Sequence, residues 1–100
     1  MDSYTVVLAW DTEWDGYTVS CPAMPGAVSC GKSRDEALAN IRESMEGWFA
    51  VAEERGFGPV PESPELVAKS VAFDLGWQAE EGWALRVETA SVAIARAVAA

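Results

Sequence analysis

The feature that most constrains this fold is a helix start at Ser33 followed by a long amphipathic segment. Ser33 and Glu36 form a capping box, in which the hydroxyl accepts from an exposed amide and the carboxylate reaches back to the amide of the cap residue. Apolar residues then recur every three or four positions, at Ala37, Leu38, Ile41, Met45, Trp48, Phe49 and Ala52. Because Gly56 ends the pattern, the sequence predicts one helix of about 22 residues, roughly 33 Å long.

The residues near the N-terminus predict a β-hairpin. Residues 4–10 (YTVVLAW) are β-branched and aromatic without a helix breaker, and residues 17–21 (YTVSC) alternate between polar and apolar types. The six residues between them, 11–16, are acidic and end in Asp-Gly, a combination typical of a hairpin turn.

Two proline-rich stretches predict rigid connections. In the first, Pro22–Gly26 (PAMPG), two prolines fix φ and Gly26 allows a positive φ, so the segment predicts a corner that leads to a short third strand at 27–30. The second stretch, 57–65, follows the long helix and predicts an extended connector.

Beyond the connector, two interpretations compete. Apolar residues alternate over 71–77 and again over 83–87, which favours a second hairpin. The triplet Ser63-Pro64-Glu65 is instead typical of a helix N-terminus. We expect the hairpin, followed at 91–100 by a strand end or a short helix. The predicted order β-β-β-α-β-β gives an α+β fold with an antiparallel-rich sheet of four or five strands packed on one long helix.

The amino-acid composition excludes several kinds of catalytic and metal-binding site. The 100 residues include 7 Lys and Arg against 16 Asp and Glu, with no histidine, so the formal net charge is −9. Without histidine there is no Ser-His-Asp or Cys-His arrangement and no ordinary zinc site, and we expect no catalytic residue and no enzyme. A domain with this charge repels phosphate backbones, so we expect a basic protein partner and no direct nucleic-acid binding.

The two cysteines and the first ten residues indicate where in the cell the protein is located. Cys21 and Cys30 are too few for a Cys₄ site and too far apart for a CxxC pair, so the simplest interpretation of each is a small buried residue with a reduced thiol. The first ten residues lack a basic targeting segment, and no uncharged stretch reaches the ~18–20 residues of a membrane span. We therefore expect a cytoplasmic protein with no cofactor, no metal and no membrane contact.

Ten residues between the predicted hairpin and the helix have a characteristic spacing. They are Gly16, Tyr17, Pro22, Pro25, Gly26, Gly31, Ser33, Glu36, Ala37 and Asn40. This order resembles the pattern G-Y-x-V-x-x-P-x-L-P-G-x-x-[ST]-x-G-x-[ST]-x-x-E-A-x-x-N of the N-terminal domain of HicB-type antitoxins, with Met24 at the usual leucine, a size-neutral change. The prolines at Pro59-Val60-Pro61 are also similar to the family, and the resemblance covers about residues 4–75.

The resemblance implies a partly degraded ribonuclease-H-like fold without catalytic acids. It also implies a protein that binds and masks a HicA-type toxin, a small basic RNA-cleaving protein. Because the 23 residues after Trp77 are too few for the C-terminal DNA-binding domain of many relatives, we expect a single HicB-like domain over 1–100. An orphan homo-oligomer without a toxin is the alternative, and a vestigial nuclease acting through Asp11 is a third hypothesis.

The acidic hairpin loop is the most conspicuous candidate site. Asp11, Glu13 and Asp15 place three carboxylates at alternate positions, yet one tight turn cannot surround a divalent cation with six oxygens. A solvated turn and an electrostatic contact with a basic partner remain as interpretations, and such a contact would raise the association rate. With Trp14 as an exposed anchor, the predicted partner interface is Asp11, Glu13, Trp14 and Asp15.

Self-association is also expected. An open sheet leaves an edge strand to protect, and the long helix has a broad apolar face for four or five short strands to cover. We therefore expect a homo-oligomer, either a dimer or a tetramer.

Overall fold

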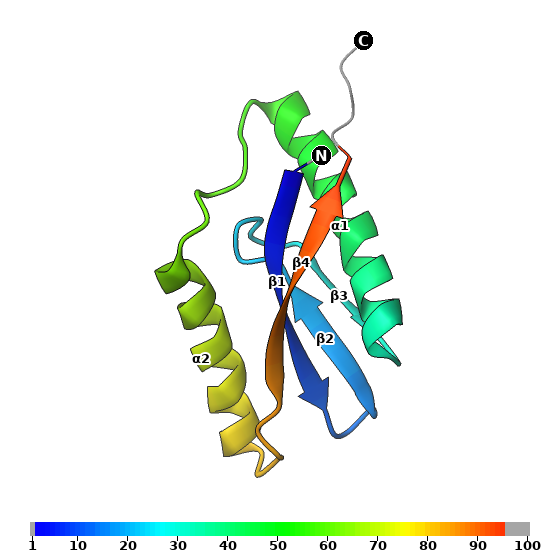
Figure 1. Cartoon of the computed structure of the whole chain (residues 1–100), viewed down its shortest axis with the longest axis vertical. Coiled ribbons are helices and arrows are strands. Elements are labelled where there is room, and N and C mark those ends of the chain that lie inside the picture. The colour runs from blue at the N-terminus through cyan, green and yellow to red at the C-terminus, as the bar shows by residue number, and fades with distance from the viewer. Residues whose placement is uncertain (1, 96–100) are drawn as a thin grey trace.

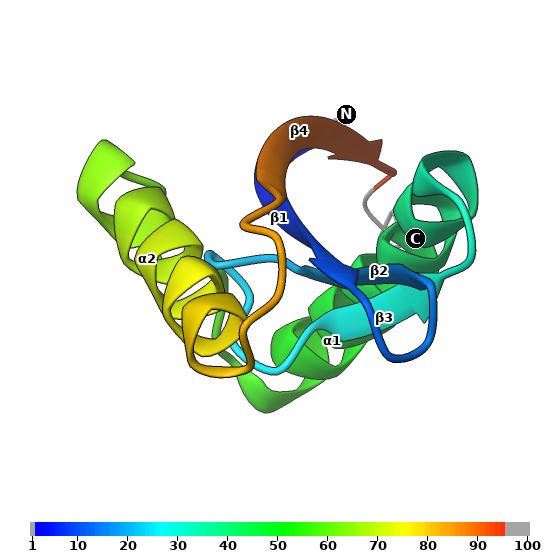
Figure 2. The ribbon, with the colours of Figure 1, turned by 90° about the horizontal axis from the view of Figure 1, so that it is seen from below.

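A computed structural model describes residues 2–95 as a four-stranded sheet with a helix on each side (Figure 1; Figure 2). The elements are β1 (Asp2–Asp11), β2 (Gly16–Ser20), β3 (Val28–Gly31), α1 (Arg34–Arg55), α2 (Pro64–Glu80) and β4 (Val87–Ile94). The strand order is β3-β2-β1-β4 and every neighbouring pair is antiparallel. The α+β class and the antiparallel sheet are confirmed.

The long helix forms as predicted and covers one face of the sheet. The Ser33 hydroxyl accepts from the Glu36 amide at 3.1 Å. The Glu36 carboxylate accepts from the Lys32 amide at 3.3 Å, one residue earlier than the capping box predicts. The buried residues of α1 are Ala37, Ile41, Met45, Phe49 and Ala52. The first four of these residues form the core with alternate strand residues, among them Val6, Leu8, Tyr17, Val19, Val92 and Ile94.

The proline-rich corner joins β2 to β3 without a loose loop. The Met24 amide donates to the Cys21 carbonyl at 3.0 Å, which closes a tight turn. Gly26 has φ +93°, so the predicted positive φ is confirmed. The indole Nε1 of Trp48 donates to the Pro25 carbonyl at 2.9 Å, and α1 therefore holds the corner in place.

The predicted second hairpin does not form: residues 71–77 belong to α2, and residues 83–86 precede β4, which begins at Val87. The competing helix start is the one that forms: the Ser63 hydroxyl accepts from the Leu66 amide at 3.2 Å, and Pro64 occupies the first turn. Phe73, which the alternation assigns to the same face as its neighbours, is 73% exposed. A helix suits this segment because its four-residue spacing places an apolar side against the sheet face that α1 leaves uncovered.

The observed order is therefore β-β-β-α-α-β rather than β-β-β-α-β-β. The C-terminal strand does form, from Val87 to Ile94, and pairs with β1 instead of with a neighbouring hairpin strand. This pairing confirms a strand end for residues 91–94. The rest of the predicted terminal segment, residues 96–100, lies outside the described residues.

Candidate partner-binding site

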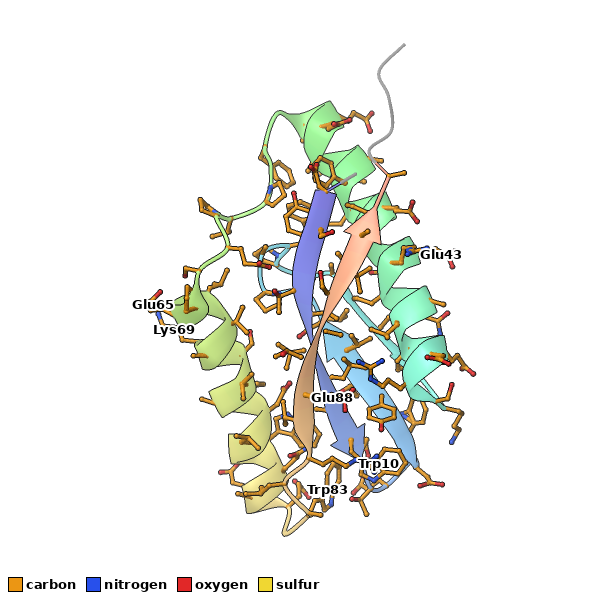
Figure 3. All side chains as sticks on the ribbon, in the orientation of Figure 1. Trp10, Glu43, Glu65, Lys69, Trp83 and Glu88 are labelled. Atoms are coloured by element: carbon orange, nitrogen blue, oxygen red, sulfur yellow. The ribbon has the colours of Figure 1, made fainter. Side chains whose placement is uncertain are left out.

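The two acidic turns of the chain lie at the same end of the molecule, the lower end in Figure 1. One turn joins β1 to β2 and the other follows α2. Figure 3 shows Trp10 and Trp83 at this end, one near each turn. We call this end the acidic pole and define it by residues 11–16 and 80–83. The exposed carboxylates of the acidic pole belong to Glu13, Asp15, Glu80 and Glu81.

A buried amide attaches α2 to the sheet at the acidic pole. Gln78 is fully buried, and its Nε2 donates to the carbonyls of Trp10 at 3.1 Å and Arg86 at 3.0 Å. Its Oε1 accepts from the Arg86 amide at 2.9 Å, while the Trp10 amide donates directly to the Arg86 carbonyl at 3.0 Å. The Gln78 amide therefore bridges the last rung of the β1–β4 ladder.

Sequence reasoning missed Gln78, because glutamine is mostly an exposed residue type. The available signal was its position on the helical stripe that contains Val67, Val71 and Leu75. A polar residue on the buried stripe of a helix needs hydrogen-bond partners on the surface that the helix covers. That reasoning requires the helix to be recognised first.

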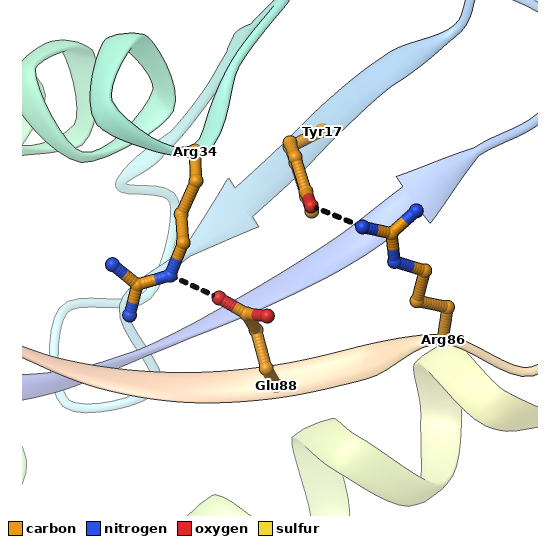
Figure 4. Close-up of polar contacts among 4 residues, drawn as sticks. All are labelled: Tyr17, Arg34, Arg86 and Glu88. Atoms are coloured by element: carbon orange, nitrogen blue, oxygen red, sulfur yellow. Dashed lines mark hydrogen bonds and ion pairs between the residues drawn. The ribbon is translucent and has the colours of Figure 1, made fainter.

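Two aromatic rings hold Arg86 next to this amide, and Figure 4 shows one of them, that of Tyr17. The guanidinium carbon of Arg86 lies 4.7 Å from the ring centroid of Trp10 and 5.5 Å from that of Tyr17. Its Nη2 donates to the Tyr17 hydroxyl at 2.8 Å, and the two rings meet edge to face at 5.1 Å. Figure 4 also shows the ion pair between Arg34 and Glu88 beside it. Arg86 is thus engaged within the chain.

The carboxylates of the β1–β2 loop have different roles. Asp11 Oδ1 accepts from the amides of Glu13 at 2.9 Å and Trp14 at 3.3 Å, so Asp11 organises the loop. Glu13 and Asp15 are exposed, and Asp15 has φ +55°. Among residues 2–95, no group of three or more His, Cys, Asp or Glu side chains is arranged to hold a metal ion.

Trp14 is half-buried rather than a free anchor. The Lys32 ammonium lies 4.6 Å from its ring centroid and also donates to its backbone carbonyl. The ring covers Gly16, where an added Cβ would lie 2.1 Å from a ring carbon. A partner that used Trp14 would have to displace Lys32. The interface formed by Asp11, Glu13, Trp14 and Asp15 stays a prediction.

The remaining motif residues hold β3 against α1. A Cβ at Gly31 would lie 2.3 Å from the Ala37 amide nitrogen, so only glycine permits this approach. The Asn40 amide donates to the Cys30 carbonyl at 2.8 Å. The Ser44 hydroxyl donates to the Val28 carbonyl at 3.3 Å. The motif therefore positions structure and contributes no reactive group.

The two cysteines differ in exposure. Both are free, Cys21 is buried as expected, and the expectation is wrong for Cys30, which is exposed on the edge strand β3. Burial raises the pKa of the Cys21 thiol above its ordinary value of 9.0, because desolvation disfavours the thiolate. The folded state therefore retains this proton more strongly than the unfolded state does.

This difference predicts two-phase thiol labelling. At pH 8 we expect a disulfide reagent such as Ellman's reagent to modify Cys30 at once and Cys21 only after denaturant is added, because burial blocks access and suppresses the thiolate. The stability contributed by the Cys21 proton is complete below pH 9.0 and lost as the pH rises through the folded-state pKa. Cys21→Ala should lack that alkaline loss. Equal labelling rates in the folded chain would contradict this description of the two thiols.

The fold is that of HicB N-terminal domains. The crystal structure of the N-terminal domain of the Burkholderia pseudomallei antitoxin HicB aligns with 94% of this chain and 99% of that chain, at TM-score 0.63 and 25% identity. The structure of the longer Burkholderia pseudomallei antitoxin HicB aligns with 94% of this chain and 64% of that one, at 0.65 and 26%. A structure titled HicA3 and HicB3 toxin-antitoxin complex shares the fold at TM-score 0.62 and 19% identity, with 94% and 99% covered.

The sequence identifies the family. Residues 4–92 match the family described as HicB_like antitoxin of bacterial toxin-antitoxin system, so the chain belongs to this family. UPF0150 protein Ta0767 of Thermoplasma acidophilum is 44% identical over 47 residues, which are 46% of this chain and 65% of that protein, slightly under two thirds of its length. The resemblance drawn from the motif is confirmed, and the match continues past residue 75.

Proposed function

We propose that this chain binds a small basic RNA-cleaving toxin of the HicA type and masks its RNA-facing surface. Membership of the HicB-like antitoxin family is the observation that carries the proposal. The net charge of −9 supports it, because an acidic chain attracts a basic partner. Covering the RNA-facing surface of a toxin involves no covalent chemistry, so we assign no catalytic residue. A cytoplasmic location is part of the proposal, since the toxin's RNA substrates are there. No helix among residues 2–95 is long and apolar enough to cross a membrane.

The acidic pole is the surface we assign to the toxin. It combines exposed carboxylates on two turns with the Trp77–Trp83 pair, whose rings meet edge to face at 5.0 Å. Leu85, directly after the second turn, is 61% exposed. In such an interface the charges mainly accelerate association, and a few apolar or aromatic side chains supply most of the affinity.

Co-expression tests the proposal directly. The probe is the short basic HicA-type protein encoded beside the gene for this chain in its source genome. We expect its expression alone to stop growth and cleave cellular RNA, and co-expression of this chain to restore growth with recovery of a stable complex. Growth arrest that persists despite folded chain, or the absence of any such neighbouring gene, would favour the orphan alternative.

Removing charge from the acidic pole should slow association. In Glu13→Gln/Asp15→Asn, two exposed carboxylates are lost while Asp11 still organises the loop, and asparagine tolerates the positive φ at position 15. We expect the association rate constant with the toxin to fall about three- to tenfold at low salt, with a smaller change near 1 M salt, where the Debye length is about 3 Å. Stopped-flow fluorescence measures this rate.

The matched control removes the same charge elsewhere. Glu53→Gln/Glu54→Gln alters two exposed carboxylates near the C-terminal end of α1, far from the acidic pole along the helix. It should change the association rate less than the variant at the acidic pole does. Equal effects of the two variants would show that total charge matters and that the acidic pole is not the docking surface.

A further inference from the structure

A groove lies between α2 and the part of the sheet that α2 leaves open. Because α2 packs mainly against β1 and β4, the same face of β2 and β3 is uncovered beside it. The groove has a volume of about 510 Å³. We call it the α2 groove and define it by residues of two strands and one helix, which are Thr18, Ser20, Val28, Lys69, Phe73 and Asp74.

The floor of the α2 groove offers no free strand edge. Thr18 and Ser20 alternate along β2 with Val19, which packs in the core with α1, so their side chains point to the groove. The backbone of β2 is already paired with β1 on one side and with β3 on the other. An extended segment in the groove would gain no ladder hydrogen bonds, whereas a helix satisfies its own backbone. A helix is therefore the element that suits the groove.

Two exposed apolar side chains line the α2 groove. Phe73 of α2 is 73% exposed and Val28, at the start of β3, is 63% exposed. Among residues 2–95 these are the two most exposed large hydrophobic side chains, and both belong to the same groove. Apolar surface gathered in one place in this way marks an interaction site. Side chains inserted between Phe73 and Val28 would remove both from water.

The two charged residues of the α2 groove lack ion-pair partners. Among residues 2–95, no cationic side chain pairs with Asp74 and no carboxylate pairs with Lys69. Burial raises the pKa of the Asp74 carboxyl above its ordinary value of 3.8, because desolvation outweighs the hydrogen bond from the Trp77 indole at 3.2 Å. A lysine or arginine of a partner placed beside Asp74 would offset this desolvation.

We propose that a helix of the basic toxin docks in the α2 groove, with apolar side chains between Phe73 and Val28 and a cationic side chain at Asp74. The inference rests on the proposed function and adds the element by which the toxin binds. The acidic pole begins at Glu80, where α2 ends, so the groove continues the surface already assigned to the toxin.

The charge pattern along the groove also gives the direction of the docked helix. Figure 3 shows Lys69 in the upper, N-terminal half of α2 and Trp83 at the lower end, in the acidic pole. A helix carries partial positive charge at its N-terminus and partial negative charge at its C-terminus. The toxin helix should therefore point its N-terminus to the acidic pole and its C-terminus to Lys69, antiparallel to α2.

The helices of this chain are poor occupants of the same groove. α1 contains six acidic residues against three arginines, and α2 contains three acidic residues against one lysine. A helix of a second copy would thus bring further carboxylates toward Asp74 and the acidic pole, where like charges repel. A basic partner has the complementary charge.

Isothermal titration calorimetry tests the groove with the neighbouring-gene toxin of the co-expression experiment. At about 0.15 M salt we expect Phe73→Gln/Val28→Thr to raise the dissociation constant about tenfold or more, because apolar anchors supply most of the affinity. The matched control Phe57→Gln/Val51→Thr makes the same changes at other exposed positions and should bind like the wild type. Circular dichroism checks that both variants are folded.

Charge reversal at Lys69 tests the direction of the helix. Lys69→Glu changes the net charge from −9 to −11, so attraction of a basic toxin by total charge alone predicts tighter binding. We expect the dissociation constant to rise about two- to fivefold instead, because a carboxylate would face the C-terminal end of the toxin helix. The control Arg55→Glu makes the same charge change at an exposed position at the end of α1 and should not weaken binding.

The outcomes separate this inference from the proposed function. No toxin binding by the wild type would overturn both. Toxin binding that is equal for the wild type and Phe73→Gln/Val28→Thr would overturn the docked helix and leave the proposed function standing. A substitution that changes only the sedimentation mass of the chain alone, with toxin binding unaltered, would assign the groove to a second copy and overturn the inference. Tighter binding by Lys69→Glu would contradict the direction of the helix.

Discussion

Gly31→Ala is expected to lower the free energy of unfolding by about 3 kcal/mol, the upper part of the range for overpacking a tight contact. The added Cβ would lie 2.3 Å from the Ala37 nitrogen, 2.7 Å from its Cα and 2.8 Å from the Glu36 carbonyl carbon. All three are backbone atoms, so no side-chain rotation relieves the overlap and the start of α1 must move away from β3. Urea unfolding followed by tryptophan fluorescence measures the change.

Gly47→Ala is the matched control within α1. Nothing lies within 4 Å of a Cβ built at Gly47, and the residue is exposed in the helix interior. Alanine there should stabilise the chain by up to about 1 kcal/mol, because glycine loses more backbone freedom in a helix. Opposite signs for the two substitutions are the expected result. Destabilisation of similar size at both positions would refute the role of close packing at Gly31.

Gln78→Leu is expected to cost about 3 kcal/mol. The substitution leaves the Trp10 carbonyl and the Arg86 amide, which are part-buried under Gln78, without the partner that this side chain supplies. Each unsatisfied buried group costs about 1–3 kcal/mol. The Arg86 amide should also exchange its hydrogen faster than in the wild type, which separates loss of this bridge from a general loosening of the core.

A second substitution at the same position adds a pH dependence. Gln78→Glu retains an acceptor for the Arg86 amide but places a carboxylate against the Trp10 carbonyl. Burial should raise the pKa of this glutamate, so the loss of stability is present at pH 7 and diminishes as the pH falls and the carboxyl is protonated. The exposed Glu80→Gln should stay within about 0.5 kcal/mol of the wild type. If the Gln78→Leu variant were as stable as the Glu80→Gln variant, the hydrogen bonds of Gln78 would not contribute to stability as described here.

Prediction from sequence succeeded where the decisive interactions are short-range. The Ser33 cap involves a residue three positions away, and the hairpin and the corner depend on their own turn residues. It failed over 71–77, where apolar residues fit both a two-residue and a four-residue spacing. The choice depended on Ser63 as a helix cap and on the sheet face that needed a cover.

Some features of the candidate site also follow from the local sequence, whereas others depend on tertiary contacts. Acidic character at Glu13 and Asp15 is a property of the sequence, and their exposure follows from the loop. The engagement of Trp14 by Lys32 is not local, because the two residues belong to segments that meet only when β3 lies beside β2. Likewise, the second acidic turn lies at the same end as the first because Gln78 attaches α2 to β1.

The sequence by itself determined the capped helix, the hairpin, the corner and a net charge of −9, and its motif indicated the HicB-like family. Only the tertiary structure decided that residues 64–80 are a helix, that Gln78 bridges two strands, and that β4 pairs with β1 and leaves its other edge open. The physical reason is distance along the chain. Gln78 and Trp10 are 68 residues apart, and such partners are selected by which surfaces remain unburied after the local elements have formed.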